Sequence, residues 1–92
     1  MQRAVFRILQ EALTNAIRHG DGSGVAVTIT WRADAVALGV RNGIRPDAAP
    51  PEGGHGIVGM RERAHLVGGR LDAGAEGGQW VVRAELPLGG VR

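Results

Sequence analysis

The fold is decided by one stretch near the start of the chain, Phe6-Arg7-Ile8-Leu9-Gln10-Glu11-Ala12-Leu13-Thr14-Asn15-Ala16-Ile17-Arg18-His19. Its apolar residues recur at helical spacing, which predicts an amphipathic helix over residues 2–19. The recurring apolar positions are Val5, Ile8, Leu9, Ala12, Leu13, Ala16 and Ile17. Gly20 is expected to end this helix, and residues 21–24 are expected to form a loop.

Polar residues follow one edge of this predicted helix. Glu11, Asn15 and Arg18 stand at i, i+4 and i+7, with His19 beside them. This spacing places them on a shared edge, although Asn is unfavourable inside a helix. Amide and carboxylate oxygens suit Mg²⁺, and a neighbouring Arg or His would offset phosphate charge. The alternative is a weak surface ion pair between Glu11 and Arg18, with Asn15 solvated.

The composition limits the class of protein. The chain has 92 residues, enough for a single domain over 1–92. It has no cysteine, which excludes a disulfide framework, thiol catalysis and Cys-ligated zinc, and fits a cytoplasmic protein. A net charge of only +2, with no dense basic cluster, argues against nucleic-acid binding. No apolar run is long enough to form a membrane segment.

The rest of the sequence predicts a two-layer fold. Alternating apolar residues predict strands near 25–31, 36–40, 70–73 and 80–86, and helical spacing predicts a helix over 57–67 that ends at Gly68-Gly69. The first two strands are expected to form an antiparallel hairpin, and residues 74–78 a turn. The expected class is α/β (α+β): a mixed, mostly antiparallel sheet of about four strands with two helices on one face.

Residues 43–56 show no periodicity, and loops of this length in small domains are often lids. Glycines just before a helix let a phosphate approach the backbone and the free N–H groups of the helix start. The glycines just before the predicted helix are Gly54 and Gly56. Arg61 and Arg63 lie past the helix start, so they are expected to be solvent-facing charges or a surface for a partner domain.

Two motifs together resemble one family. The first helix is similar to the N-box of histidine kinases, above all the subfamily with NarL-type regulators, in which Q-E-A-L-T-N-A-x-R-H is usual. The run from Gly54 to Ala64 is similar to the G-x-G-L-x-G-M-x-E-R block of the same kinases. The resemblance implies the GHKL-type ATP-binding fold shared with gyrase, Hsp90 and MutL, with ATP and Mg²⁺ as cofactors.

The resemblance also implies roles for single residues. It makes Asn15 a Mg²⁺ ligand, and it makes Glu11 the catalytic acid/base or a residue that reaches the metal through water. Arg18 and His19 would lie near the phosphates. The lid at 43–56 would cradle the triphosphate, with Gly54, Gly56 and Gly59 shaping its hinge. His55 either contacts phosphate or is an exposed lid residue.

The sequence departs from the family at the adenine site. The kinases have Asp-x-Gly-x-Gly after the second strand, whereas this chain has Arg41-Asn42-Gly43. Alignment on the glycine gives Arg41 the Asp position. Alignment on the strand gives it to Asn42, which we prefer because Val40 then keeps its inward phase. Asn42 would accept the hydrogen bond of the adenine amino group. Gln79 takes the place of a Thr that often closes this pocket.

The implied function is that of a catalytic domain of a two-component sensor histidine kinase. It would donate the ATP γ-phosphoryl to a histidine on a dimerisation domain absent from this sequence, which looks N-terminally incomplete. A response regulator would be the further partner, and the chain alone is expected to be a monomer. The alternatives are an anti-sigma-factor-type serine kinase and a non-catalytic truncated remnant.

Overall fold

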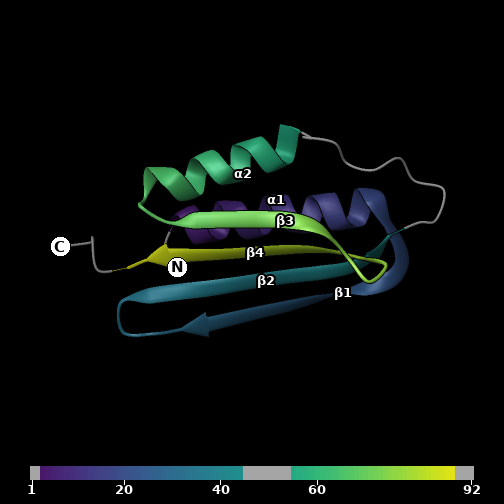
Figure 1. The fold of residues 1–92 in the computed structure, drawn as a ribbon, viewed down its shortest axis with the longest axis horizontal. Helices are drawn as coiled ribbons and strands as arrows, with labels where there is room; N and C mark the ends of the chain where they lie inside the picture. The colour runs from purple at the N-terminus through teal and green to yellow at the C-terminus, as the bar shows by residue number, and fades with distance from the viewer. Residues whose placement is uncertain (1–2, 45–54, 89–92) are drawn as a thin grey trace.

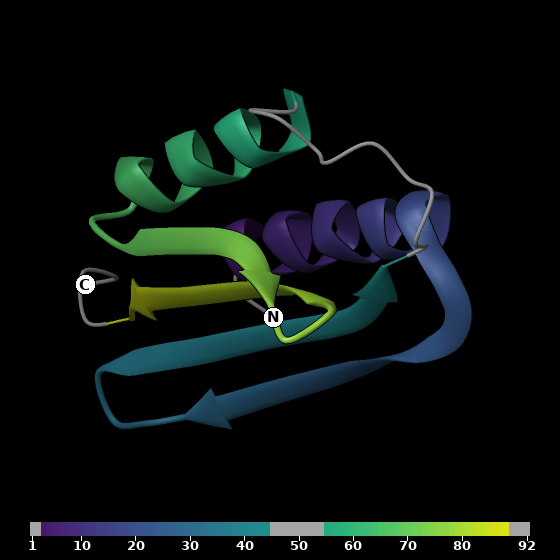
Figure 2. The ribbon, with the colours of Figure 1, turned by 45° about the vertical axis from the view of Figure 1, so that its right-hand side comes forward.

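The computed structural model describes residues 3–44 and 55–88. The elements are α1 (Arg3–His19), β1 (Gly20–Trp31), β2 (Ala35–Ile44), α2 (His55–Leu66), β3 (Arg70–Glu76) and β4 (Gln79–Pro87). The strands form one sheet in the order β1-β2-β4-β3, and all neighbouring strands in it are antiparallel. Both helices lie on the same face of this sheet (Figures 1 and 2). The predicted two-layer sandwich is confirmed.

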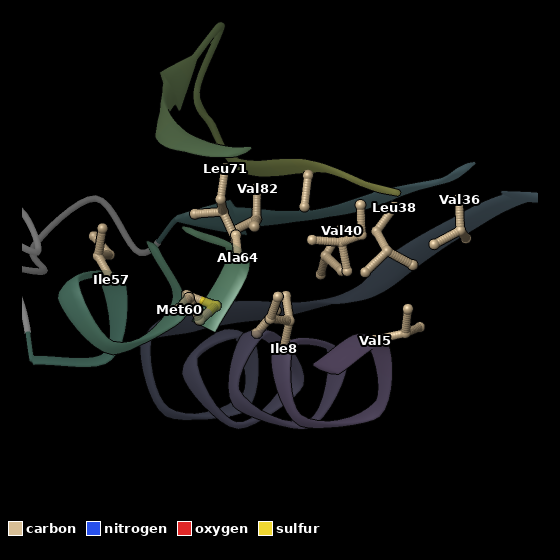
Figure 3. Packing of buried hydrophobic residues seen from close by; sticks show 13 residues of the cluster. Val5, Ile8, Val36, Leu38, Val40, Ile57, Met60, Ala64, Leu71 and Val82 are labelled. Carbon is tan, nitrogen blue, oxygen red and sulfur yellow. The ribbon is translucent and has the colours of Figure 1, made fainter. Parts of the chain in front are cut away.

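The hydrophobic core fills the space between the helices and the sheet (Figure 3). Alternate residues of β2 point into it, because strand side chains alternate between the two faces of a sheet. The helices close it with residues at helical spacing, Ile8 from α1 and Met60 from α2 being almost fully buried. The cluster comprises Val5, Ile8, Ala12, Val36, Leu38, Val40, Ile57, Met60, Ala64, Leu71, Val82, Ala84 and Leu86.

A Schellman motif ends α2 and turns the chain into β3. The N–H of Gly69 donates to the carbonyl of Ala64 at 2.8 Å, and the N–H of Gly68 donates to that of His65 at 3.0 Å. Gly68 has a φ of 80°, a left-handed conformation that side chains with a Cβ disfavour. The sequence therefore predicted the end of this helix correctly.

The expected loop at 21–24 is wrong, because β1 begins at Gly20. The pairing with β2 nevertheless shifts there: Gly20 lies opposite Ile44, and Val25 lies opposite Asn42. The intervening residues bulge out of the ladder. Within the bulge the Oδ1 of Asp21 accepts hydrogen bonds from the N–H and Oγ of Ser23, at 2.8 and 2.6 Å. The sequence predicted the irregular backbone at residues 21–24 but not the pairing of Gly20 with Ile44, which continues β1 past it.

Other boundaries also differ from those predicted. β2 extends to Ile44 and β3 to Glu76, because each finds a partner strand beyond its apolar run. The turn before β4 is therefore only Gly77-Gly78, with φ of 56° and 81°. Of the expected lid at 43–56, the ends belong to β2 and α2, and residues 45–54 lie outside the described residues.

Part of the expected apolar face is exposed. Ile17 on α1 is 80% exposed, and Val27 and Trp31 on β1 are 43% and 53% exposed. Val27 lies opposite the buried Val40, so it is on the helix-facing side of the sheet. β1 is an edge strand that the helices leave largely uncovered, which hydrophobic spacing alone does not reveal. In the described part of the chain, neither helix has the length and hydropathy to cross a membrane.

Candidate functional site

The polar residues of α1 lie at the end of the molecule where three elements meet. α1 and α2 run in opposite directions, so the C-terminal end of α1 lies at the same end as the start of α2 (Figure 1). β2 also ends there, as both views of the ribbon show (Figure 2). Glu11 in the first motif and Ile57 in the second are 46 residues apart in the sequence. The antiparallel helices nevertheless bring the two motifs to the same end of the molecule.

The edge of α1 that carries Glu11 and Asn15 is turned towards α2. One helical turn earlier on this edge, Arg7 lines a groove together with Arg63 and Leu66 of α2. Since residues four apart share a helix edge, Glu11 and Asn15 continue the same side of α1. Both side chains are half-buried, whereas Arg18 and His19 at the end of the helix are exposed.

Asn42, at the end of β2, is the only buried polar side chain among the described residues, with 3% exposure. Its Nδ2 donates to the carbonyl of Gly43 at 3.0 Å. That acceptor fixes the orientation of the amide, because the opposite rotamer would place two acceptors together. Oδ1 is buried and has no hydrogen-bond partner in the described part of the chain. Such an orphaned acceptor costs about 1–3 kcal/mol, so the geometry fits an external donor.

Asn42 packs beneath the junction of α1 and β1. A Cβ placed on Gly20 would lie 3.3 Å from Asn42 Nδ2 and would collide with the carbonyl oxygen of Ala16. Only a residue without a side chain lets the end of the helix come so close to the strand. Gly20 thereby holds the Asn15 edge and the Asn42 amide at one place.

Trp80 is a site residue that the sequence reading missed. It lies directly opposite Asn42 in the β2–β4 pair and is partly buried against the core. Cross-strand partners have their side chains on the same face of a sheet, so Trp80 flanks the Asn42 amide. Trp80 alternates with the buried Val82 and Leu86 along β4, and this spacing could have placed it on the helix-facing side of the sheet.

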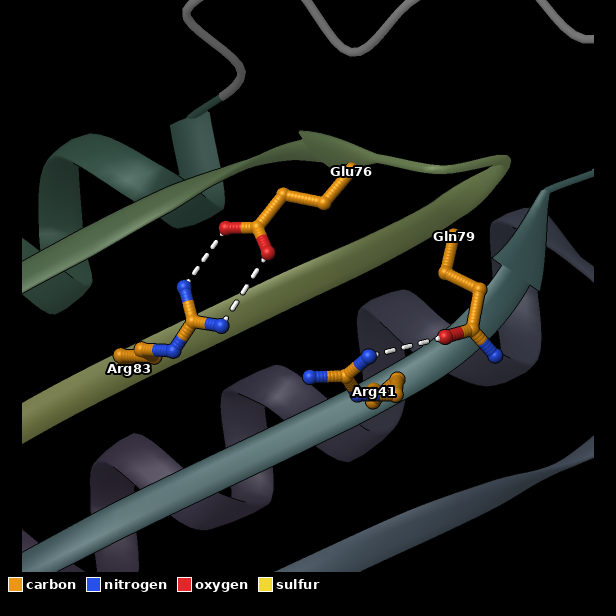
Figure 4. A network of polar contacts seen from close by, with 4 residues as sticks. All are labelled: Arg41, Glu76, Gln79 and Arg83. Atoms are coloured by element: carbon orange, nitrogen blue, oxygen red, sulfur yellow. Dashed lines mark hydrogen bonds and ion pairs between the residues drawn. The ribbon is translucent and has the colours of Figure 1, made fainter.

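Gln79, which stands in the place of the family's pocket-closing Thr, has its side chain on the other face of the sheet from Asn42. Its Oε1 accepts a hydrogen bond from Arg41 Nη1 at 3.1 Å, and Arg41 lines the open face of the sheet (Figure 4). The expectation for Gln79 came from counting along the glycines rather than along the strand. The strand register also shows that Arg41, the other candidate for the Asp position, points away from the helices.

The lid residues are placed only in part. His55 and Gly56 begin α2, so their backbone belongs to a helix start with free N–H groups. Gly54 lies outside the described residues. Gly59 is within α2, and a Cβ placed on it would meet nothing within 4 Å. The described residues contain no group of three or more His, Cys, Asp and Glu side chains that could hold a metal ion.

Charged residues on the open face of the sheet form pairs among themselves. Arg83 donates to both carboxylate oxygens of Glu76, at 2.6 and 3.1 Å (Figure 4). These hydrogen bonds lower the pKa of Glu76 and raise that of Arg83. Ser23 likewise lowers the pKa of Asp21 by hydrogen bonding to its carboxylate. The Glu76–Arg83 pair lies on the open face of the sheet, whereas the Asp21 carboxylate lies close to the Asn42 amide, since a Cβ placed on Gly43 would collide with Asp21 Oδ2.

The fold and the site define an ATPase domain of a known class. Residues 1–90 match the family described as histidine kinase-, DNA gyrase B- and HSP90-like ATPase, and the chain belongs to this family. Within it, the chain is similar to sensor histidine kinases. It is 37% identical over 71 residues to YxjM of Bacillus subtilis, covering 77% of this chain and 17% of that protein. It is 33% identical over 87 residues to LnrJ of the same organism, covering 91% and 21%.

Solved structures agree on the fold. The histidine kinase AdeS of Acinetobacter baumannii has a TM-score of 0.73 at 14% identity, covering 94% of this chain and 46% of that one. The kinase domain of the Erythrobacter litoralis EL346 blue-light activated histidine kinase has a TM-score of 0.68 at 24% identity, covering 94% and 44%. The chain thus spans about a fifth of the curated relatives and under half of these structures.

Proposed function

We propose that this chain is the Mg·ATP-binding catalytic domain of a two-component sensor histidine kinase. In this proposal it donates the γ-phosphoryl of ATP to a histidine on a dimerisation domain outside the chain. The observation that carries the proposal is the buried Oδ1 of Asn42 beside the end of α1, which has no hydrogen-bond partner among the described residues. Membership of the ATPase family indicates that the ligand is ATP. The buried Asn42 Oδ1 is an acceptor that the adenine amino group could use.

Asn42 and Trp80 form the base site in this proposal. The exocyclic amino group of adenine donates to Asn42 Oδ1, and Trp80 flanks the ring from β4. A neutral amide makes a weaker hydrogen bond than the carboxylate that the kinases usually have at this position. We therefore expect weaker ATP binding than an Asp at residue 42 would support with the same contacts.

The edge of α1 holds the metal and the phosphates. Asn15 would supply a side-chain oxygen ligand to Mg²⁺, and Glu11 would act through a metal-bound water or as general base. The ion would neutralise phosphate charge, and Mg²⁺ in proteins usually takes oxygen ligands and keeps several waters. Arg18 and His19 offset further charge. His55 and the glycines at the start of α2, Gly56 above all, offer backbone N–H groups to the triphosphate.

The partners and setting follow from the same proposal. The chain works with a histidine-bearing dimerisation domain and a response regulator, of the NarL type that the N-box wording indicates. We place it in the cytoplasm, where ATP is available, and expect it to be a monomer when isolated. Light scattering on the purified chain tests the oligomeric state.

The test of the phosphoryl transfer uses the chain, γ-labelled ATP and a separately purified histidine-bearing dimerisation domain of a sensor kinase. The expected product carries a label that is stable in alkali and lost in acid, because phosphohistidine has an acid-labile P–N bond. Glu11→Gln should abolish labelling without unfolding the chain, since Glu11 makes no ion pair within the described residues.

Two outcomes would favour the alternatives. An acid-stable label on an added anti-sigma-factor antagonist, with none on the histidine domain, would indicate a serine kinase. A folded chain that neither binds ATP nor labels any acceptor would be a non-catalytic remnant, a reading motivated by Asn at position 42.

A further inference from the structure

A second pocket lies at the opposite end of the helix layer from the nucleotide site. It opens between the start of α1 and the end of α2, which are neighbours because the two helices run antiparallel (Figure 1). Its volume is about 370 Å³. It is lined by Arg3, Ala4, Arg7, Arg63, Leu66 and Val67. We call this the arginine slot.

The three arginines of the slot are unpaired. On the open face of the sheet, Arg83 and Arg70 both form ion pairs with glutamates. In the described part of the chain, by contrast, the side chains of Arg3, Arg7 and Arg63 form no hydrogen bond or ion pair. Three arginines thus line one small pocket, and within residues 3–44 and 55–88 none of them has a carboxylate partner.

The positions of these arginines are unfavourable for α1 itself. The first turn of α1 contains no acidic residue and does contain Arg3, although a helix start favours negative charge. Arg3 and Arg7 stand at i and i+4, where like charges repel and destabilise a helix. An anion bound between them would relieve both effects, so the local electrostatics favour an acidic ligand.

The slot also has an apolar floor. Ala4 and Val67 are partly buried and pack against the hydrophobic core. Leu66 stands at the rim with 85% of its surface exposed. A free phosphate or a nucleic-acid backbone would use the arginines and leave this floor uncovered. An apolar side chain flanked by carboxylates would use both.

We infer that the arginine slot docks an acidic peptide segment of a partner protein, with an apolar side chain on the floor and carboxylates on Arg3, Arg7 and Arg63. Arg7 is one helical turn from Glu11 on the same edge of α1, but Arg3 and the end of α2 lie further from Asn15, so we expect the docked peptide to leave Asn15 and Asn42 uncovered. The surface gives the domain a place to be held by a partner while its ATP site stays open.

The experiment titrates the purified chain with a fluorescein-labelled peptide in which one leucine has two glutamates on either side. Binding is measured by fluorescence anisotropy, and ¹H–¹⁵N spectra locate it. Variants Arg7→Gln and Arg63→Gln should each weaken binding about two- to fivefold, the range for exposed charge pairs. The matched control Arg61→Gln removes the same charge from an exposed α2 residue outside the slot. Leu66→Ser tests the apolar rim of the slot, and because Leu66 is 85% exposed this change should leave the fold intact.

The inference is supported if the peptide binds and if Arg7→Gln, Arg63→Gln and Leu66→Ser weaken its binding while Arg61→Gln does not. The amide resonances of Ala4 and Val67 should also shift when the peptide binds. A peptide with glutamines in place of glutamates should then not bind. The inference is overturned if the peptide does not bind at its solubility limit, or if Arg61→Gln weakens binding as much as the slot variants. It is also overturned if vesicles of anionic lipid bind through these arginines and the peptide does not. ATP at saturation should leave the peptide affinity unchanged.

Discussion

Asn42 and Trp80 face one another as direct partners in the β2–β4 pair, on the side of the sheet that carries the helices. Directly opposite residues in antiparallel strands have Cβ atoms about 4.5–5.5 Å apart, so a group that reaches Asn42 Oδ1 comes close to the indole. The amide is oriented by Gly43 and packed by Gly20. The chain therefore holds a hydrogen-bond acceptor and an aromatic ring together, ready for a flat ligand with an amino group.

Replacing Asn42 by Leu should separate binding from stability. Leu has a similar shape, and it removes the buried acceptor that lacks a partner, so the free energy of unfolding should stay equal or rise, by up to about 1–3 kcal/mol. ATP affinity should fall at least about tenfold, because the base loses its acceptor. Urea unfolding and an ATP titration measure the two quantities.

Asn42→Asp is the matched control for that variant. The carboxylate still accepts from the base but cannot donate to Gly43 and carries a buried charge, so the free chain should be less stable and ATP should restore more of its stability. If Asn42→Leu bound ATP as tightly as the original chain, Asn42 would not lie in the base site.

Trp80 should report the nucleotide directly. The chain has two tryptophans, and Trp31 is 53% exposed on the edge strand. In a Trp31→Phe background, ATP should shift or quench the remaining fluorescence. Trp80→Ala should weaken binding by about fivefold or more, given the 1–3 kcal/mol that aromatic stacking of a base contributes. Fluorescence that ATP leaves unchanged would place the base elsewhere.

Two glycine substitutions on or next to α2 should have opposite effects on stability. Gly68→Ala forces a Cβ into a left-handed conformation and should cost about 1–2 kcal/mol. Gly59→Ala is inside the helix with open space around its Cβ, so it should stabilise by about 0.5–1 kcal/mol. Thermal unfolding measures both. A loss of ATP binding in Gly59→Ala, despite the gain in stability, would show that the bound phosphates need the space at residue 59.

The ion pair of Glu76 and Arg83 should give a small, signed dependence of stability on pH. Hydrogen bonds from Arg83 hold the pKa of Glu76 below its ordinary value of 4.5. The pair therefore stabilises the fold above about pH 4.5, and this contribution is lost as the pH falls through the lowered pKa of the folded state. The melting temperature of Glu76→Gln should lie slightly below that of the original chain at neutral pH.

That difference should vanish in acid. Glu62→Gln removes the same charge from an exposed residue of α2 that has no ion pair in the described part of the chain. It should therefore show no such trend. An equal acid response in both variants would assign the effect to net charge rather than to the pair with Arg83.

Periodicity predicted the elements of this fold because each has a clear apolar face. The helix around Ile8, the strand around Val40 and the end of α2 at Gly68 all follow from local patterns. The bulge at Asp21 did not, because it depends on where β2 ends and pairs. Ile17 and Val27 fit the apolar spacing of their elements but are 80% and 43% exposed, because hydrophobic spacing cannot show how far the helix layer extends over the sheet.

The candidate site was predictable to a similar extent. Asn15 and Asn42 followed from helix and strand phase, and at Gly20 the end of α1 that carries Asn15 comes close to Asn42. Counting from the glycines puts Gln79 in the place of the family's Thr, whereas the strand register puts Trp80 opposite Asn42. The sequence did not predict the arginine slot, although Arg63 was considered as part of a surface for a partner domain. Arg3 and Arg63 are 60 residues apart in the sequence and come together only through helix packing.

The central claim is a Mg²⁺-dependent ATP site on the edge of α1. The most direct measurement is a calorimetric titration of the chain with a non-hydrolysable ATP analogue, with and without Mg²⁺, alongside Asn15→Ala. The account predicts that the original chain binds more tightly with Mg²⁺ and that Asn15→Ala, still folded, loses this Mg²⁺-dependent gain. A folded chain that does not bind the analogue, or an Asn15→Ala variant that keeps the full Mg²⁺ effect, would contradict it.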